Sequence, residues 1–269
     1  SPTISNNIRE TSIMGITVGK SYDLNAAEFF NATQTLTPIQ KQAVNGLVVD
    51  LKNYSIWDKM KAVYPMVGQA DVSSSFSYNL KDINTFRGTF SGTWIFSSTG
   101  AKPNGSTGYM DTGLIPSASI SNYNAHASFY SRTNLAGGVD VGAFQGAANF
   151  YASAYYFNGN RNFLQRGDSD GVIYTPTKYT GCFVWNAPNQ NLATTYEDGI
   201  LKGQSTTTTT QNRPTVNVTI SAFNDNGNKY LFSPRECAFA SIGDGLTDTE
   251  AINLSTAIQR FQTTLGRQV

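Results

Sequence analysis

The sequence predicts a mainly β protein, an antiparallel jelly-roll sandwich with helices before it and one amphipathic helix after it. The first observation behind this prediction is a hairpin: the strand-like run 192–196 is turned by Glu197-Asp198-Gly199 and returns through 200–202. Asp-Gly between apolar runs is a strong hairpin signal, because the turn requires positive φ angles that these two residues tolerate. The hairpin predicts neighbouring antiparallel strands.

Two further observations support the same fold class. The run 216–220 alternates, so that Val216, Val218 and Ile220 share one buried face. Short runs of this kind recur at regular spacing with turn residues between them, which is typical of a sandwich. No alternation of strand and helix patterns is visible, and this disfavours a parallel sheet.

The composition excludes several classes of function. The 269 residues carry a net charge of +1, which argues against a nucleic-acid-binding face. Only 14% of the residues are charged, against roughly 25% in ordinary soluble domains, so the polar surface must consist of Ser, Thr, Asn and Gln. No run reaches the roughly 18 apolar residues of a membrane span, and no secretory apolar region stands at the start. We therefore expect neither a nucleic acid nor a membrane as a partner.

Residues 1–68 are predicted to form an N-terminal arm and a helical segment. The first 20 residues are polar and weakly patterned. They contain most of the run 15–21, which is similar to a phosphate-binding loop but one residue short, because Met14 stands where the pattern needs a glycine. No strand-then-helix unit surrounds the run, so it does not predict nucleotide binding.

Two or three amphipathic helices are expected in the rest of this segment. Asp23 is placed to cap a short first helix, and Thr37 before Pro38 fits the start of a second one. Apolar residues keep helical spacing along this second helix, and those in 57–63 continue the same spacing.

Residues 69–245 are predicted to form the jelly roll, because the apolar pattern changes to a period of two after Gly68. Thr206–Thr210, between two of its strands, is expected to be an exposed loop or a sheet edge. Besides the hairpin and the run 216–220, the expected strands lie in 76–80, 86–96, 125–129, 139–143, 150–157, 163–164, 172–174, 182–185, 223–230, 231–232 and 237–240.

Residues 246–269 are predicted to form a C-terminal docking helix. Thr247 and Glu250 make a capping box, and Gly266 is placed for the C-terminal cap. This helix and the N-terminal helices each carry an apolar stripe that needs a surface to pack on. Both the chain's own sandwich and a neighbouring subunit would serve. The stripe of the last helix consists of Ala251, Leu254, Ile258, Phe261 and Leu265.

Cysteine and histidine usage predicts no metal centre and no cofactor. Cys182 and Cys237 lie in apolar runs and are expected to be buried free thiols, with a disulfide between them left open. No Cys/His cluster with zinc spacing exists. His126 is the single histidine and is expected to be an outward strand residue rather than a base or a ligand.

The sequence predicts that the chain is not an enzyme. A glycoside hydrolase needs two carboxylates roughly 5–10 Å apart across a cleft. Glu197 and Asp198 are adjacent, so they point to opposite faces, and Asp248 with Glu250 belongs to a helix start, where acids favour the dipole. No Gly-x-Ser-x-Gly elbow is present.

Two loop motifs have the composition of known kinds of binding site. Arg166-Gly167-Asp168 matches a cell-adhesion tripeptide but is more simply a polar turn. Asp168, Asp170 and Asp225 lie in expected loops that offer oxygen ligands to calcium. Any Asn/Asp turn offers the same ligands, so we predict no metal site.

Glycan binding is a serious possibility, because jelly-roll loops present aromatic and amide side chains to sugars. The alternative is that the aromatic residues fill the sandwich core. The sequence does not name the binding residues. The exposed-looking candidates are Tyr109, Tyr123, Tyr130 and Tyr174.

Two stretches of the chain carry a recognisable pattern. The first stretch consists of 37–40, 57–68 (WDKMKAVYPMVG), 79–82, 97–105 (SSTGAKPNG) and 108–112. The second stretch consists of 240–248 (ASIGDGLTD) and 259–267 (QRFQTTLGR). Together they resemble structural proteins of tailed bacteriophages that carry a concanavalin/laminin-G-like module, and the Tyr-x-Asp-Gly hairpin at 196–199 resembles that of laminin-G-like jelly rolls. The likeness covers residues 35–269.

The resemblance implies a role in the virion, in a tail, fibre or capsid appendage, usually in several copies. It implies other virion proteins as partners and a homo-oligomer, and it brings no catalytic site to transfer. We therefore predict a non-enzymatic phage structural protein that assembles through protein contacts. The alternatives are a lectin-like module that binds host surface glycans and, in third place, a glycan-cleaving enzyme.

Overall fold

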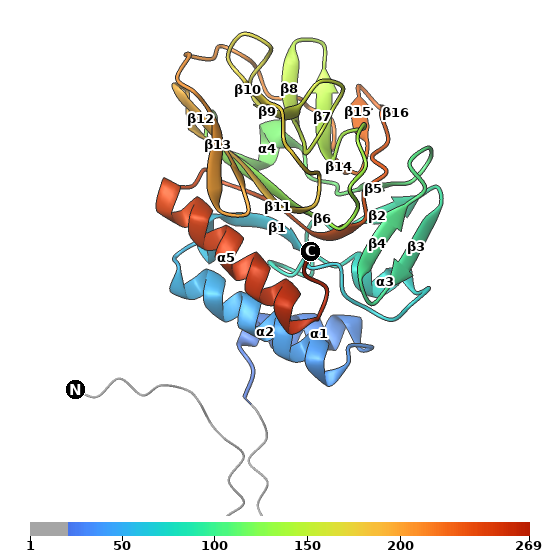
Figure 1. Ribbon diagram of the computed structural model, residues 1–269. Helices are drawn as coiled ribbons and strands as arrows, with labels where there is room; N and C mark the ends of the chain where they lie inside the picture. The colour runs from blue at the N-terminus through green and yellow to red at the C-terminus, as the bar shows by residue number, and fades with distance from the viewer. Residues whose placement is uncertain (1–20) are drawn as a thin grey trace, which may run out of the picture.

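The computed structural model describes residues 21–269 and has the predicted fold class (Figure 1). Two mostly antiparallel sheets pack on one another as a jelly-roll sandwich, with helices along one side. The expected arm and the run 15–21 lie outside the described residues, apart from Ser21. Among the described residues, no helix has the length and the apolar character needed to cross a membrane.

The first sheet, here called the helix-side sheet, has eight strands in the order β13-β12-β11-β6-β17-β4-β3, with β1 paired to β17. The hairpin β12–β13 is the one predicted from Asp198-Gly199, and both turn residues have positive φ angles, 50° and 80°. The strands are β1 (Met60–Tyr64), β3 (Trp94–Ser97), β4 (Gly100–Pro103), β6 (Ala125–Ser131), β11 (Gly181–Asn189), β12 (Leu192–Glu197), β13 (Ile200–Ser205) and β17 (Cys237–Gly243).

The second sheet, here called the outer sheet, runs in the order β10-β9-β8-β7-β14-β5-β2. The short hairpin β15–β16 attaches to it, because β15 pairs in parallel with β7. The strands are β2 (Thr89–Ser91), β5 (Tyr109–Asp111), β7 (Val141–Gln145), β8 (Ala148–Ser153), β9 (Asn160–Leu164), β10 (Val172–Tyr174), β14 (Thr219–Ile220), β15 (Phe223–Asp225) and β16 (Asn228–Tyr230).

The main core lies between the two sheets. Phe129, Phe183 and Trp185 of the helix-side sheet face Phe150 of the outer sheet there, and all four are fully buried. The indole Nε1 of Trp185 donates a hydrogen bond of 3.0 Å to Oδ1 of Asn160 across this core. The expected inward residues of 216–220 belong to the same core.

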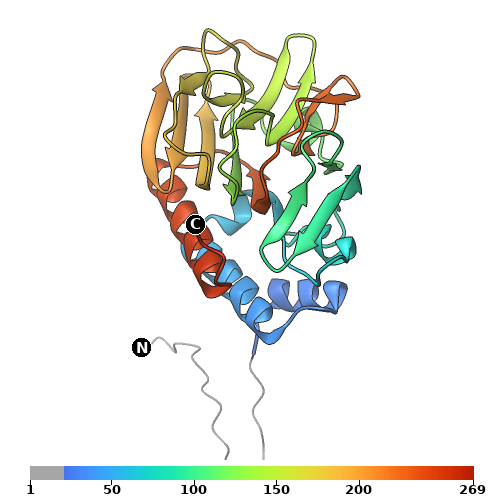
Figure 2. The same cartoon turned by 45° about the vertical axis from the view of Figure 1, so that its right-hand side comes forward.

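The helices cover the other face of the helix-side sheet. Figure 2 shows α2 and α5 side by side along this face, with α1 beyond α2. Their apolar stripes form one buried cluster with Tyr130, Val184 and Phe239 of the sheet, so both stripes pack on the chain's own sandwich. The helices are α1 (Leu24–Thr33), α2 (Pro38–Asn53), α3 (Ser73–Phe76), α4 (Pro116–Ser119) and α5 (Asp248–Thr264), with a 3-10 turn, η1 (Trp57–Lys59).

The predicted helix caps are confirmed. Asp23 accepts from the backbone N–H of Asn25 at the start of α1. Thr37 and Thr247 each form a complete capping box, at α2 and α5. Gly266 follows the last turn of α5 with a φ angle of 65°.

The prediction of a helix through 57–63 is wrong, because this stretch continues from η1 into β1. The pairing of β1 with β17 shifts register between Met60 and Ala62, which marks a β-bulge. The bulge places Met60 and Val63 together in the helix layer, while Ala62 and Tyr64 face the core between the sheets. A bulged strand buried on both faces therefore imitates the i, i+3 spacing of a helix. As a result, β1 belongs to the sandwich although it lies within residues 1–68.

Both cysteines are buried free thiols, as predicted. Burial raises the pKa of each thiol well above its ordinary value of 9. The two thiols are therefore protonated and unreactive at neutral pH.

The prediction of an outward His126 is wrong. This residue of β6 is fully buried, and its Nδ1 lies 2.5 Å from the backbone oxygen of Asp244. Burial lowers the pKa of His126 from 6.5 to about 4, although Asp244 acts in the opposite direction. The side chain does leave the core between the sheets, as alternation requires, but the chain after β17 covers it.

His126 should make the protein sensitive to mild acid. Between pH 4 and 6.5 the unfolded chain binds a proton at this histidine that the folded chain does not bind, so stability falls as the pH is lowered. From pH 7 to 4.5 we expect His126 to account for a loss of about 2.5 kcal/mol in the free energy of unfolding. Urea unfolding of wild type and His126→Gln at both pH values measures this loss as a smaller acid effect in the variant. An equal acid effect in the two proteins would contradict the prediction.

Candidate functional site

The face of the outer sheet that points away from the main core carries a continuous group of aromatic side chains. Alternation along β8 explains why they lie there: Phe150 and Ala152 face the core, so Tyr151 faces outward. In the same way Leu164 of β9 faces inward and Phe163 outward. We define the aromatic patch as Phe144, Tyr151, Tyr156, Phe157, Phe163, Phe223 and Tyr230.

The rings of the aromatic patch contact one another in a chain. Tyr151 lies at the centre, with its ring centroid 4.9 Å from that of Phe223 and 5.1 Å from that of Phe163, both edge-to-face. Phe223 in turn contacts Tyr230 at 5.4 Å. Tyr156 and Phe157 of the loop after β8 extend the chain at the other end, 4.3 Å apart. Such edge-to-face pairs add about 0.5–1.5 kcal/mol each beyond the area they bury, so the inner rings form a rigid base.

The outer rings of the aromatic patch remain accessible. Phe157 is 65% exposed and Tyr230 40% exposed, and Ile173 on neighbouring β10 is 42% exposed. Ile173 is the cross-strand partner of Arg161 and so lies on the same face. Exposed apolar groups gathered on one face, with polar groups at the rim, are typical of binding sites.

Arg161 of β9 is packed among the rings of the aromatic patch. Its guanidinium carbon lies 4.6 Å from the ring centroid of Tyr156 and 5.1 Å from that of Phe163. Its Nη1 is 3.3 Å from Oδ1 of Asp168, and its Nη2 donates to Oδ1 of Asn158 at 2.9 Å. These contacts fix both the guanidinium and the ring of Tyr156 in place.

The tyrosine hydroxyls of the aromatic patch stay protonated at neutral pH. Burial raises the pKa of Tyr151 to about 12, although the neighbouring Arg161 lowers it. Burial also raises the pKa of Tyr230, and Asp225, which accepts from its hydroxyl at 3.2 Å, raises it further. The patch therefore offers ring faces, neutral hydroxyls and carboxylate oxygens, which suits a ligand with apolar faces and many hydroxyl groups.

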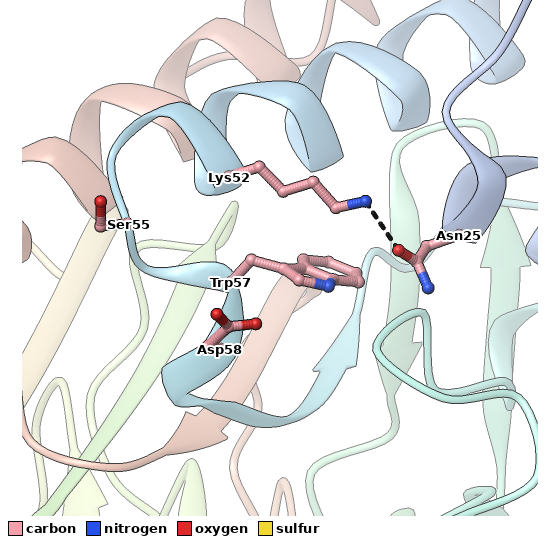
Figure 3. Close-up of a pocket in the computed structure, with 5 residues that line it drawn as sticks. All are labelled: Asn25, Lys52, Ser55, Trp57 and Asp58. Carbon is pink, nitrogen blue, oxygen red and sulfur yellow. Dashed lines mark hydrogen bonds between the residues drawn. The ribbon is translucent and has the colours of Figure 1, made fainter.

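Two hollows elsewhere on the surface are less suited to a ligand. The larger, about 460 Å³, lies between the start of α1 and η1 and is lined by Asn25, Lys52, Ser55, Trp57 and Asp58 (Figure 3). The indole of Trp57 is 6% exposed, with Lys52 and Lys81 near its ring. Lys52 is itself held by Asp23 and Asn25, so its charge is already neutralised.

The second hollow, about 400 Å³, lies at the start of α5 and includes Lys59, Asn124 and Asp248. Lys59 forms an ion pair with Glu250 of the capping box, and Asp248 accepts from the hydroxyl of Tyr196. These polar groups serve the attachment of α5 to the sheet.

The sequence-predicted tyrosines are scattered by the fold. Tyr130 is fully buried under α5, so its prediction as an exposed residue is wrong. Tyr174 is half-buried and donates to Glu197, and Tyr123 is half-buried beside Gln165. Tyr109 alone of the four faces outward on the outer sheet, where Lys229 covers its ring at 5.6 Å.

The two loop motifs make contacts within the chain. Arg166 is fully buried and donates to backbone oxygens, including those of Thr207 and Asn189, so it is inaccessible to an adhesion receptor. Asp170 is buried and accepts from the N–H of Gly167. In residues 21–269, no group of three or more His, Cys, Asp or Glu side chains is placed to hold a metal ion.

Sequence reasoning missed Tyr156, Phe157 and Tyr230, which make up the accessible part of the aromatic patch, and the Arg161 packed among its rings. A signal was present in the run 150–157, which is aromatic on both faces of a strand. One face of such a strand fills the core, and the other must be covered or functional. The run alone did not indicate that the β15–β16 hairpin would supply the remaining rings.

Comparison with known proteins identifies the fold but no family. No family model and no curated protein matches the sequence. A mutant of Trypanosoma rangeli sialidase displaying trans-sialidase activity matches 81% of this chain with a TM-score of 0.50 and 12% identity. Botulinum neurotoxin type C, from a study of its entry through two ganglioside molecules, matches 76% with a TM-score of 0.51 and 11% identity. The matches span 39% and 52% of those proteins, and at such identity the likeness establishes the sandwich fold alone.

The packing of Arg161 should contribute measurably to stability. Its side chain is 12% exposed and its stem and plane rest on two rings. We expect Arg161→Ala to lower the free energy of unfolding by about 1–2 kcal/mol, and Arg161→Lys to restore only part of this, because an ammonium does not stack. Chemical denaturation measures both. Lys202→Ala, at an exposed site on β13, is the matched control and should change stability by less than about 0.5 kcal/mol. A neutral effect of Arg161→Ala would show that the packed geometry does not persist in solution.

Proposed function

We propose that this chain is a non-enzymatic glycan-binding module and that the aromatic patch is its binding site. The observation that carries the proposal is the row of rings that begins fully packed at Tyr151 and ends exposed at Phe157 and Tyr230. A sugar ring has an apolar C–H face that stacks on an aromatic side chain and hydroxyls that need hydrogen-bond partners. The aromatic patch and its rim of Asn158, Asp168 and Asp225 supply both kinds of contact.

The structural neighbours support this choice of ligand class over assembly alone. One is a sialidase, and the other is a toxin whose entry is described as dependent on two ganglioside molecules. The packing of the helices helps to decide between glycan binding and assembly, because an exposed apolar stripe on a helix would favour contact between subunits. Both stripes here are used within the chain. The outer sheet, in contrast, gathers exposed apolar side chains, Phe157, Ile173 and Tyr230, around one cluster of rings.

A place in a phage particle, implied by the resemblance in the sequence, is compatible with this role. We propose that the module is displayed on the virion and contacts host surface glycans there. Shallow sites of this kind bind weakly, and several copies on one particle raise the effective affinity without any new contact. Antibodies against the chain should label intact virions of its source, and labelling confined to debris would contradict virion display.

Glycan arrays with the labelled, folded protein test the proposed function. We expect binding to a subset of glycans, and a fall of tenfold or more in affinity for Phe157→Ala and Tyr156→Ala, because each loses a stacking surface. Ile95→Ala removes a side chain that is 60% exposed on β3 and should leave binding unchanged. Titration calorimetry gives the affinities, and release of reducing ends from a bound glycan is expected to stay at background. Absence of binding across a broad array would contradict the proposed glycan binding. Steady release of sugar from a bound glycan would instead indicate an enzyme.

A further inference from the structure

The charges around the aromatic patch carry information about which sugars it accepts, and this inference rests on the proposed function. Arg161 is the cation packed among these rings, and only 12% of its side chain is exposed. Its two terminal nitrogens are occupied by Asp168 and Asn158. The guanidinium is therefore a structural element of the patch, and its charge is already balanced.

The carboxylates at the rim are the accessible charges. The side chain of Asp168 is 86% exposed beside Arg161. It is close enough to Tyr156 to raise the pKa of that hydroxyl, which burial also raises and Arg161 opposes. Asp168 is paired with Arg161, but the carboxylate is the exposed end of this ion pair and the guanidinium is the buried end. A ligand stacked on Tyr156 or Phe157 therefore meets the negative end of the pair at this side of the aromatic patch.

A second carboxylate lies beside Tyr230 of the aromatic patch. Asp225 on β15 accepts from the hydroxyl of Tyr230, a ring that is 40% exposed. Lys229, the next cation along the hairpin, points elsewhere: its ammonium donates to the backbone oxygen of Gly227 and lies over the ring of Tyr109. The charge of Asp225 is thus left without a cationic partner in the described residues.

We propose that the aromatic patch selects neutral sugars and discriminates against sugars that carry a carboxylate, such as sialic and uronic acids. The oxygens of Asp168 and Asp225 accept hydrogen bonds from sugar hydroxyls, and charged acceptors make stronger bonds of this kind than neutral ones. The same two charges repel a sugar carboxylate bound between them. The selectivity is therefore the opposite of that suggested by a sialidase or ganglioside-binding neighbour.

The test compares matched glycan pairs that differ by one carboxylate, for example lactose and sialyllactose, or a glucose polymer and its oxidised uronate form. Wild type should bind the neutral member of each recognised pair at least tenfold more tightly. This preference should shrink as salt rises from 50 to 500 mM, because screening weakens the repulsion. Binding of the neutral member should hardly change with salt.

Two substitutions separate charge from shape. Asp168→Asn removes one negative charge and keeps an oxygen for Arg161, so affinity for the acidic member should rise about tenfold, and further in the double variant with Asp225→Asn. Neutral binding should fall by no more than a few fold. Asp58→Asn makes the same charge change on η1, where the carboxylate is fully exposed on the helix side. This control should alter neither the affinity for the acidic glycan nor the affinity for the neutral one.

The outcomes distinguish this inference from the proposed function. A wild-type protein that binds no glycan of either kind overturns the proposed function. A protein that binds glycans but prefers the acidic member, or whose Asp168→Asn variant gains nothing for it, overturns the selectivity while leaving the aromatic patch as the site. Melting curves of each variant confirm that a change in binding does not come from unfolding.

Discussion

The packing of the helix layer on the helix-side sheet depends on the hydrogen bonds that the guanidinium of Arg267 donates. It is fully buried and donates to the backbone oxygens of Pro65, Met66 and Ala238 at 2.5–2.7 Å, while its Nε donates to Gln262. The exit of β1, strand β17 and the end of α5 are thereby joined at one point. Burial lowers the pKa of this guanidinium to about 9, which indicates how costly the site is for a charge. The backbone oxygens offset that cost by accepting from the charged donor, and the Ala238 oxygen also accepts from the side-chain amide of Gln262.

This junction determines which surface is left for function. Because α5 is fixed at both its capping box and Arg267, the helix layer stays closed over the helix-side sheet. The inner faces of the two sheets close on each other. The outward face of the outer sheet is then left to the aromatic patch. Its inner rings are buried by their neighbours, and Phe157 and Tyr230 stay exposed without destabilising the core. Arg235 serves this layer in a similar way, paired with buried Asp140 beneath the β15–β16 hairpin.

Features set by local chemistry could be predicted from the sequence. The capping boxes at Thr37 and Thr247 and the Asp198-Gly199 turn depend on residues within four positions of each other, so the sequence alone was sufficient. Features set by long-range contacts could not. The bulge in β1 exists because of β17, more than half the chain away in sequence, and His126 is buried by the segment after that same strand. The aromatic patch has the same origin, because β8, β9 and β15 supply its rings and meet only once β15 pairs with β7.

The rigidity of the aromatic patch explains why an open, shallow surface can still be selective. A deep pocket excludes wrong ligands by shape, whereas a flat one must rely on groups that are already held in position. Here Phe223 contacts the ring of Tyr230 edge-to-face and Tyr151 contacts the ring of Tyr156. The guanidinium of Arg161 also packs on the ring of Tyr156. Stacking a sugar then costs little further side-chain entropy. The carboxylates of Asp168 and Asp225 are positioned by the same framework, so their repulsion acts at a fixed place. Specificity thus follows from packing beneath the surface rather than from enclosure above it.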